Sequence, residues 1–99
     1  MITADFGIVP IGNKENNITE YVKVAVESIK NSGLNYELTG MGTQIEAQNL
    51  NELYLAITDA QEAVFNLGIN RVYTVIKIDD RRDKNRTLQD KIKTVNDLL

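Results

Sequence analysis

The sequence predicts an α+β fold in which helices cover one face of a four-stranded antiparallel sheet. Apolar and polar residues alternate in four short segments, which is the period of a strand. In the segments between them apolar residues recur every three or four positions, which is the period of a helix. The chain has 99 residues, which is the size of one domain, so we expect residues 1–99 to fold as a single unit.

The first strand is predicted over residues 2–11, where Ile2, Ala4, Phe6 and Ile8 lie on one side. Pro10 has no N–H group for a ladder, so the strand is expected to end there or to lie at an edge. A polar loop is predicted over residues 12–17. The first helix follows from Ile18 to Ile29, and Gly33 is a suitable stop.

A hairpin is predicted next, with strands over residues 34–39 and 41–48. Thr39 and Gly40 are expected to form a two-residue turn that pairs Leu38 with Met41. One face of this hairpin then carries the less polar side chains, which are Leu34, Tyr36, Leu38, Met41, Thr43, Ile45 and Ala47.

A second helix is expected after Asn49, which suits an N-cap, and is expected to end at Gly68. The fourth strand is predicted over residues 71–79, with Val72, Thr74, Ile76 and Ile78 facing inward. A charged loop, DDRRDKNR, leads to Thr87, which is expected to cap a short amphipathic helix.

Strand, helix, strand, strand, helix, strand is the order of the ferredoxin-like fold, and here one further helix follows it. Each strand–helix–strand unit is expected to cross over in the right-handed sense. The sheet face that the helices leave uncovered is predicted to be polar, with Glu37, Gln44, Glu46, Tyr73 and Lys77 on it.

The composition bounds the chemistry of the protein. A net charge of −3 and a pI of about 4.8 argue against a nucleic-acid partner, which requires a surplus of Lys and Arg. The absence of Cys and His removes thiolate chemistry and the commonest general base and metal ligand. Because the N-terminus has no basic region and Asp5 interrupts its apolar run, we expect no signal peptide, no membrane span and a cytoplasmic location.

Two threonines, Thr43 and Thr74, fall on otherwise apolar strand faces beneath the predicted helices. A hydroxyl in such a place needs a hydrogen-bond partner. Either both hydroxyls line a pocket and bind a polar ligand, or each one bonds a backbone carbonyl. Two glycines within strands, Gly7 and Gly42, either leave space for a ligand or let a helix pack closely.

Charged residues offer weaker candidates. The run IDDRRD, residues 78–83, has the carboxylates of a magnesium–diphosphate site, but its two arginines would repel a cation, so a solvated charge run or intersubunit ion pairs are favoured. Asp5, Glu37 and Glu46 are candidates for acid–base catalysis. Catalytic carboxylate pairs need burial, which an open sheet face does not give.

Three segments together resemble the small thiamine-binding family of YkoF-like proteins, which was long uncharacterised. They are IVPIG (Ile8–Gly12), YELTGMGTQIEA (Tyr36–Ala47) and RVYTVIKIDDRRDK (Arg71–Lys84). The resemblance covers nearly the whole chain, and the order and spacing of the segments agree. Gly40 stands where such proteins usually have Pro.

The resemblance implies a ferredoxin-like subunit that assembles as a homotetramer, a dimer of dimers. It implies that the subunit binds thiamine, or its hydroxymethylpyrimidine part, between the sheet and a helix without catalysis. We expect no other cofactor and no metal. The resemblance also implies that Thr43 lies in the pocket beside Ile8, Met41 and Gly42. Strand alternation leads us to add further candidates, which are Tyr36, Glu37, Glu46 and Thr74.

The leading hypothesis is therefore a non-catalytic carrier, buffer or sensor of thiamine. The alternative is a structural or regulatory homo-oligomer whose pocket is vestigial or holds another small heterocycle. An enzyme acting on a thiamine precursor is the third hypothesis, and the absence of His and Cys disfavours it.

Overall fold

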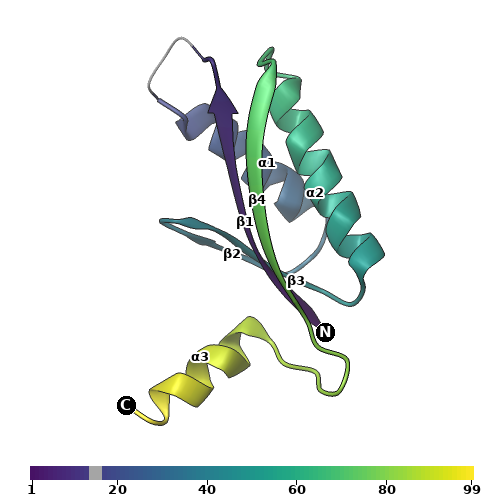
Figure 1. The fold of residues 1–99 in the computed structure, drawn as a ribbon, viewed down its shortest axis with the longest axis vertical. Coiled ribbons are helices and arrows are strands. Elements are labelled where there is room, and N and C mark those ends of the chain that lie inside the picture. The colour runs from purple at the N-terminus through teal and green to yellow at the C-terminus, as the bar shows by residue number, and fades with distance from the viewer. Residues whose placement is uncertain (14–16) are drawn as a thin grey trace.

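Four strands and three helices follow one another in residues 1–13 and 17–99, the part of the chain that the computed structural model describes (Figure 1). Their order is that of the predicted ferredoxin-like fold. The polar loop predicted over residues 12–17 lies partly outside the described residues. The elements are β1 (Ile2–Ile11), α1 (Thr19–Asn31), β2 (Tyr36–Thr39), β3 (Gly42–Ala47), α2 (Leu50–Phe65), β4 (Arg71–Asp80) and α3 (Leu88–Asn96).

The strands form one antiparallel sheet in the order β2-β3-β1-β4. The central strand β1 pairs with β3 on one side and with β4 along its whole length on the other. Helices α1 and α2 pack on one face of the sheet, as predicted (Figure 1). Both β2 and β4 are edge strands.

The core lies between this face and the two helices. Along β1 the alternating residues Ile2, Ala4, Phe6 and Ile8 are buried, as the period of two predicts. The helices supply residues at spacings of three and four, chiefly Ala25, Ile29, Leu53, Ala60 and Val64. Each fully buried Leu, Ile, Val or Phe side chain contributes roughly 1.5–3 kcal/mol, so this layer is the main source of stability.

Local chemistry fixes the ends of the helices. The side chain of Asn49 accepts a hydrogen bond from the Glu52 N–H at 2.9 Å, and Thr87 and Asp90 form a reciprocal capping box at α3. Gly33 and Gly68 follow α1 and α2 with φ of +81° and +96°, which side-chain-bearing residues rarely adopt. The predicted caps and stops at these positions are confirmed.

The hairpin turn lies one residue later than predicted. Thr39 pairs with Gly42 and Leu38 pairs with Thr43, so Gly40 and Met41 form the turn. The Thr39 hydroxyl accepts a hydrogen bond from the Met41 N–H and donates one to the Gly42 carbonyl, which closes the turn at this register. Met41 is therefore 94% exposed at the hairpin tip, and the prediction that it pairs with Leu38 is wrong.

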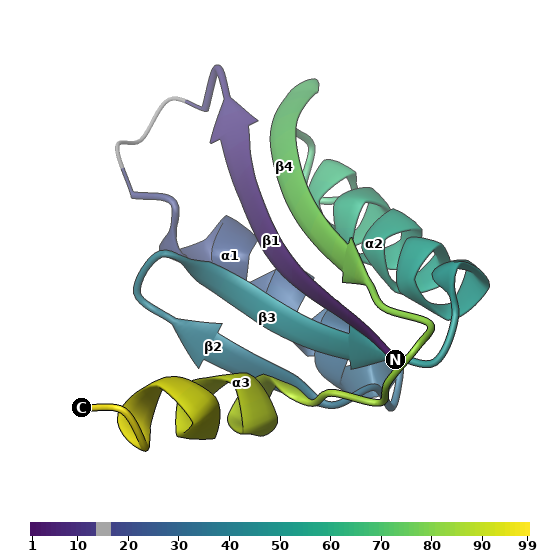
Figure 2. The same cartoon turned by 60° about the horizontal axis from the view of Figure 1, so that its bottom comes forward.

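The second face of the sheet, which we call the open face, is not covered by α1 or α2. It carries Glu37, Gln44, Glu46, Tyr73 and Lys77, as predicted. Val9 and Val75, which were not predicted there, form an exposed apolar strip with Tyr73. The expectation of a uniformly polar face is therefore wrong at the β1–β4 end. Figure 2 shows α3 returning beside β2 and β3 on this side.

Helix α3 buries none of its residues, although its sequence is amphipathic. Polar contacts hold its first turns. Glu46 of β3 accepts a hydrogen bond from the Leu88 N–H at 2.8 Å, and the Lys91 ammonium donates to the Thr3 hydroxyl at 2.7 Å and pairs with Asp79. Val95 in the last turn of α3 and Leu98 beyond its end remain exposed.

Candidate functional site

A cavity of about 190 Å³ lies between α1 and the sheet, and we call it the helix-side cavity. Its walls come from residues 6–9 of β1, from residues 38–43 of the hairpin and from the apolar face of α1. Four sequence-predicted site residues meet there, which are Ile8, Met41, Gly42 and Thr43. The helix predicted over Ile18–Ile29 is the one that covers them.

Thr43 is the polar side chain buried most deeply in this cavity. It lies opposite Phe6 of β1, with its side chain toward α1, and is 4% exposed. No described residue forms a hydrogen bond with its hydroxyl. Its oxygen is not among the fully enclosed side-chain atoms that lack a partner, so it is reached from the cavity and is available to a ligand that can bond it.

The remaining side chains around Thr43 are mostly apolar and none is charged. Val22 and Val26 of α1 face Ile8 and Leu38 of the sheet across the cavity. Such walls suit the faces of a flat heteroaromatic ring, and one fixed hydroxyl suits a ring nitrogen or an amine. Drug-sized pockets measure about 300–1,000 Å³, so this smaller cavity matches one substituted ring.

Gly42 contributes space on the other face of the sheet. A Cβ atom added to it would lie 3.1 Å from the Phe6 carbonyl oxygen and 3.2 Å from Oδ1 of Asp5, whose side chain is on the open face. The glycine therefore lets the Asp5 carboxylate approach the backbone of β3. Its backbone lines the helix-side cavity beside Thr43, while the space left by its missing Cβ is on the open face.

Thr74 already has a partner and does not line the cavity. Its hydroxyl donates to Oε1 of Gln61 on α2 at 2.6 Å. The sequence left open whether the two threonines share a pocket, and the structure separates them.

Three more candidates, Tyr36, Glu37 and Glu46, meet in a different hollow beside the start of α3. Glu46 holds α3 through the Leu88 N–H and accepts a longer hydrogen bond from Asn35. Glu37 accepts one from Gln89 at 3.4 Å. Tyr36 shares the face of Thr43 but lies opposite Ile45, further along the hairpin.

Sequence reasoning missed the contribution of Val22, Val26 and Leu38 to the helix-side cavity. The signal was present in α1, where these valines lie four residues apart, beside the fully buried Ala25 and Ile29. The valines form a second apolar row along α1, beside the row that packs into the core, and this second row lines the cavity.

The charged run at the end of β4 is paired largely within itself, whereas its Asp79 pairs with Lys91 of α3. Arg81 pairs with Asp83 and Arg82 with Asp80, each at 2.8 Å. Hydrogen bonds from these arginines hold the pKa values of both aspartates below their usual range. Within residues 1–13 and 17–99 no three acidic, His or Cys side chains are grouped so that they could hold a metal ion.

None of the helices in the described residues has both the length and the apolar character needed to cross a membrane.

Comparison with known proteins gives a consistent picture. The model of a family described as "Thiamine-binding protein" matches residues 4–96. A UPF0045 protein of Methanothermobacter thermautotrophicus is 46% identical over 99 residues, which is the full length of both chains.

Solved structures agree with the fold. A hypothetical protein of Methanocaldococcus jannaschii superposes with a TM-score of 0.87 at 36% identity, over 96% of this chain and 95% of that one. A proposed thiamine biosynthesis/salvage protein of Thermotoga maritima gives a TM-score of 0.79 over 95% and 97% of the two chains. At 19% identity, this second match supports the fold alone.

Proposed function

Because the chain belongs to the thiamine-binding protein family, we propose that it binds thiamine, or the hydroxymethylpyrimidine part of thiamine, in the helix-side cavity and does not transform it. The observation that carries this proposal is the hydroxyl of the deeply set Thr43, which has no partner among the described residues and faces a cavity with apolar walls. The description of the T. maritima protein, which has the same fold, also favours a thiamine-related role.

In the proposed complex the pyrimidine ring occupies the cavity. Ile8 and Leu38 pack on the ring from the sheet, and Val22 and Val26 pack on it from α1. The Thr43 hydroxyl bonds a ring nitrogen or the exocyclic amine. A cavity of about 190 Å³ holds this ring, and the cationic thiazolium then lies at the mouth.

Met41 is suited to the mouth of the cavity. It is 94% exposed at the hairpin tip, and its flexible thioether adapts to a bound ring more readily than a branched side chain does. The net charge of −3 favours a cationic ligand over an anionic one.

The proposed working form is a homotetramer, a dimer of dimers, in the cytoplasm. The exposed strip of Val9, Tyr73 and Val75 supports assembly, because water-exposed apolar side chains gathered on one face are typical of interfaces. The same strip favours the second candidate function, a structural or regulatory oligomer whose pocket is vestigial or holds another heterocycle.

Isothermal titration calorimetry tests the proposal. The protein is titrated with thiamine, with hydroxymethylpyrimidine and with the thiazole alcohol. The molecular masses of the recovered ligands are then measured by mass spectrometry. We expect saturable binding of thiamine and of the pyrimidine, little heat from the thiazole, and unchanged masses. A folded protein that binds none of the three contradicts the proposal, and a changed mass indicates an enzyme.

A further inference from the structure

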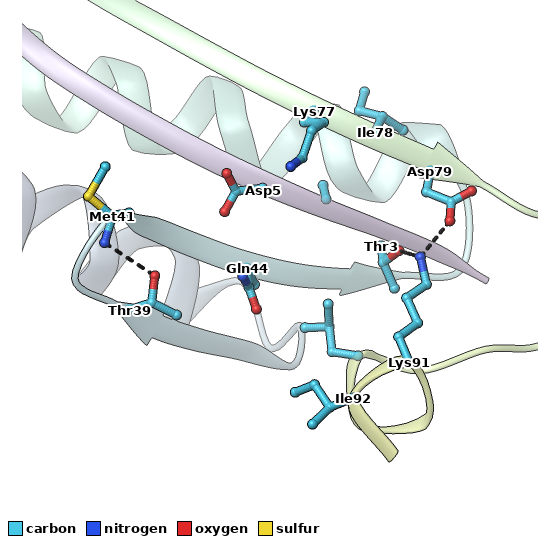
Figure 3. A pocket seen from close by; sticks show the side chains of 12 residues that line it. Thr3, Asp5, Thr39, Met41, Gln44, Lys77, Ile78, Asp79, Lys91 and Ile92 are labelled. Atoms are coloured by element: carbon cyan, nitrogen blue, oxygen red, sulfur yellow. Dashed lines mark hydrogen bonds and ion pairs between the residues drawn. The ribbon is translucent and has the colours of Figure 1, made fainter. Parts of the chain in front are cut away.

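A second cavity lies on the open face of the sheet, and we call it the open-face cleft. It measures about 580 Å³, which is within the usual range for small-molecule sites. Strands β1, β3 and β4 form its floor, the first turns of α3 form one wall, and Thr39 and Met41 of the hairpin tip form another (Figure 3).

The wall made by α3 is held by polar anchors. The Lys91 ammonium bonds Asp79 and the Thr3 hydroxyl, and Thr3 is itself only 5% exposed. Glu46 fixes the Leu88 N–H at the start of the helix. Since α3 buries no residue, these contacts place Leu88 and Ile92 over the cleft without adding to the core.

Inside the cleft three polar side chains have no hydrogen-bond or ion-pair partner among the described residues. They are Asp5, Lys77 and Gln44, which lie side by side on neighbouring strands because Asp5 is directly opposite both Lys77 and Gln44. Figure 3 shows the Lys77 ammonium and the Asp5 carboxylate in the same part of the cleft, with no interaction between them.

Gly42 gives the Asp5 carboxylate its place. The carboxylate lies 3.2 Å from where a Cβ of Gly42 would be, so any larger residue would displace it. Gly7, the next residue of β1 on the same face as Asp5, has no other atom within 4 Å of where its Cβ would lie. Gly42 therefore accommodates the Asp5 carboxylate, and no ion pair joins that carboxylate to the Lys77 ammonium.

We propose that the open-face cleft is a second ligand site that binds a small zwitterion with an apolar body. It lies on the other face of the sheet from the helix-side cavity and shares with it only Thr39 and Met41 of the hairpin. Asp5 accepts from the ligand's ammonium group and Lys77 donates to its carboxylate, with the Gln44 amide bonding either group. The apolar body lies against Ile92 and Met41, which line the two walls.

A matched set of three compounds tests this site. Phenylalanine carries both charges, phenethylamine carries only the amine, and 3-phenylpropanoate carries only the carboxylate. Each is titrated into the full-length protein and followed by amide chemical shifts in two-dimensional NMR. We expect phenylalanine to bind at least about tenfold more tightly than either partial compound, since each of those leaves one charged group unpaired.

Two variants assign the contacts. Asp5→Asn is expected to weaken phenylalanine and phenethylamine about tenfold and to leave 3-phenylpropanoate unchanged. Lys77→Met is expected to weaken phenylalanine and 3-phenylpropanoate about tenfold and to leave phenethylamine unchanged. Lys93→Met is the matched control, because Lys93 pairs with Asp97 on α3 and does not line the cleft. Thr43→Val, in the helix-side cavity, is also expected to leave phenylalanine binding unchanged.

The outcomes separate the alternatives. Equal affinities for the three compounds, or shifts confined to α1, overturn the proposal. So does a shift of the cleft amides with protein concentration alone, which would mean that a second copy of the chain covers them. If Asp5→Asn does not fold, Lys77→Met alone tests the proposal. Lys77 is exposed and no described residue bonds its side chain, so this substitution is expected to leave the fold intact.

Discussion

Gly42 and Gly7 are two strand glycines with different physical requirements. Neither adopts a positive φ, so backbone freedom does not explain them. A Cβ at Gly42 would lie 3.1 Å from the Phe6 carbonyl oxygen, which is backbone and cannot move freely, whereas a Cβ at Gly7 would meet nothing within 4 Å. Their neighbours therefore decide what each position tolerates.

We predict that Gly42→Ala lowers the free energy of unfolding by about 1–3 kcal/mol, the usual cost of a forced contact in a packed site. Gly7→Ala is the matched control and is expected to change it by less than about 0.5 kcal/mol or to stabilise the strand. Urea denaturation of the two variants measures both values. Equal destabilisation by the two substitutions would show that the contact at Gly42 is unimportant.

At the scale of single elements, β3 serves both faces of the sheet. Thr43 points toward α1, while Gln44 and Glu46 point toward the open face. Alternation along this strand already separates Thr43 from Glu46, so grouping them in one pocket conflicted with the period of two. The structure gives Glu46 a different contact, with the first turn of α3.

We predict that Glu46→Ala releases α3 without affecting the ligand. Loss of the acceptor for the Leu88 N–H should raise the exchange rate of that amide at least about tenfold, because one hydrogen bond contributes about 1–1.5 kcal/mol. The affinity for thiamine should stay within about twofold of wild type. Glu37→Ala, which removes only the longer contact with Gln89, is the control for amide exchange. A large loss of thiamine affinity in Glu46→Ala would show instead that Glu46 contributes to the ligand site.

The capping box of α3 predicts a dependence on pH. Hydrogen bonds from the Thr87 backbone and side chain hold the pKa of Asp90 below its ordinary value of 3.8. A carboxyl whose pKa is lower in the folded state stabilises that state above the unfolded pKa, and this stabilisation is lost as the pH falls through the folded pKa. We therefore expect the amides of α3 to lose protection below about pH 4.

Asp90→Asn should remove most of that dependence from the amides of α3. The readout must be local, because Asp80 and Asp83 also have lowered pKa values and contribute to global stability with the same sign. Protection of α3 that stays constant down to the lowest pH at which the rest of the protein is folded would exclude the capping box as its support.

At the scale of the whole molecule, periodicity was enough to predict the order of the elements, the helix-covered face and the ferredoxin-like topology. The alternation of Ile2, Ala4, Phe6 and Ile8, together with the stop at Gly68, carried most of that prediction. The hairpin register could not be predicted, because it depends on which backbone groups the Thr39 hydroxyl bonds.

The candidate site was predictable only in part. Met41, Gly42 and Thr43 are consecutive in the sequence and were expected in one pocket, and the resemblance to a known family placed Ile8 beside them. The contribution of α1 and the pairing of Thr74 with Gln61 depend on how helices pack on the sheet, which periodicity does not specify. The face on which Gly42 leaves space likewise depends on the position of Asp5 across the strand pair.

The exposed side chains of β4 offer a surface for assembly of the whole molecule. Tyr73 and Val75 are 59% and 55% exposed on the long edge strand β4. If they lie in an oligomer interface, the double variant Tyr73→Glu/Val75→Lys should lower the mass in solution from that of a tetramer to a dimer or monomer. Tyr54→Glu is the matched control, because Tyr54 is a comparably exposed aromatic on α2. Sedimentation velocity measures both. A monomeric wild-type protein at micromolar concentration would contradict the proposed assembly.

Two matched threonine variants test whether the Thr43 hydroxyl bonds the pyrimidine of thiamine in the helix-side cavity. Calorimetric titration with thiamine is carried out on Thr43→Val and on Thr74→Val, which removes the same atom from the other threonine on that face. We predict that Thr43→Val weakens binding by about 1–2 kcal/mol, or roughly tenfold, through the loss of one hydrogen bond at nearly constant shape. Thr74→Val should bind thiamine as the wild type does. Equal affinities for both variants and the wild type would remove Thr43 from the site and contradict the account.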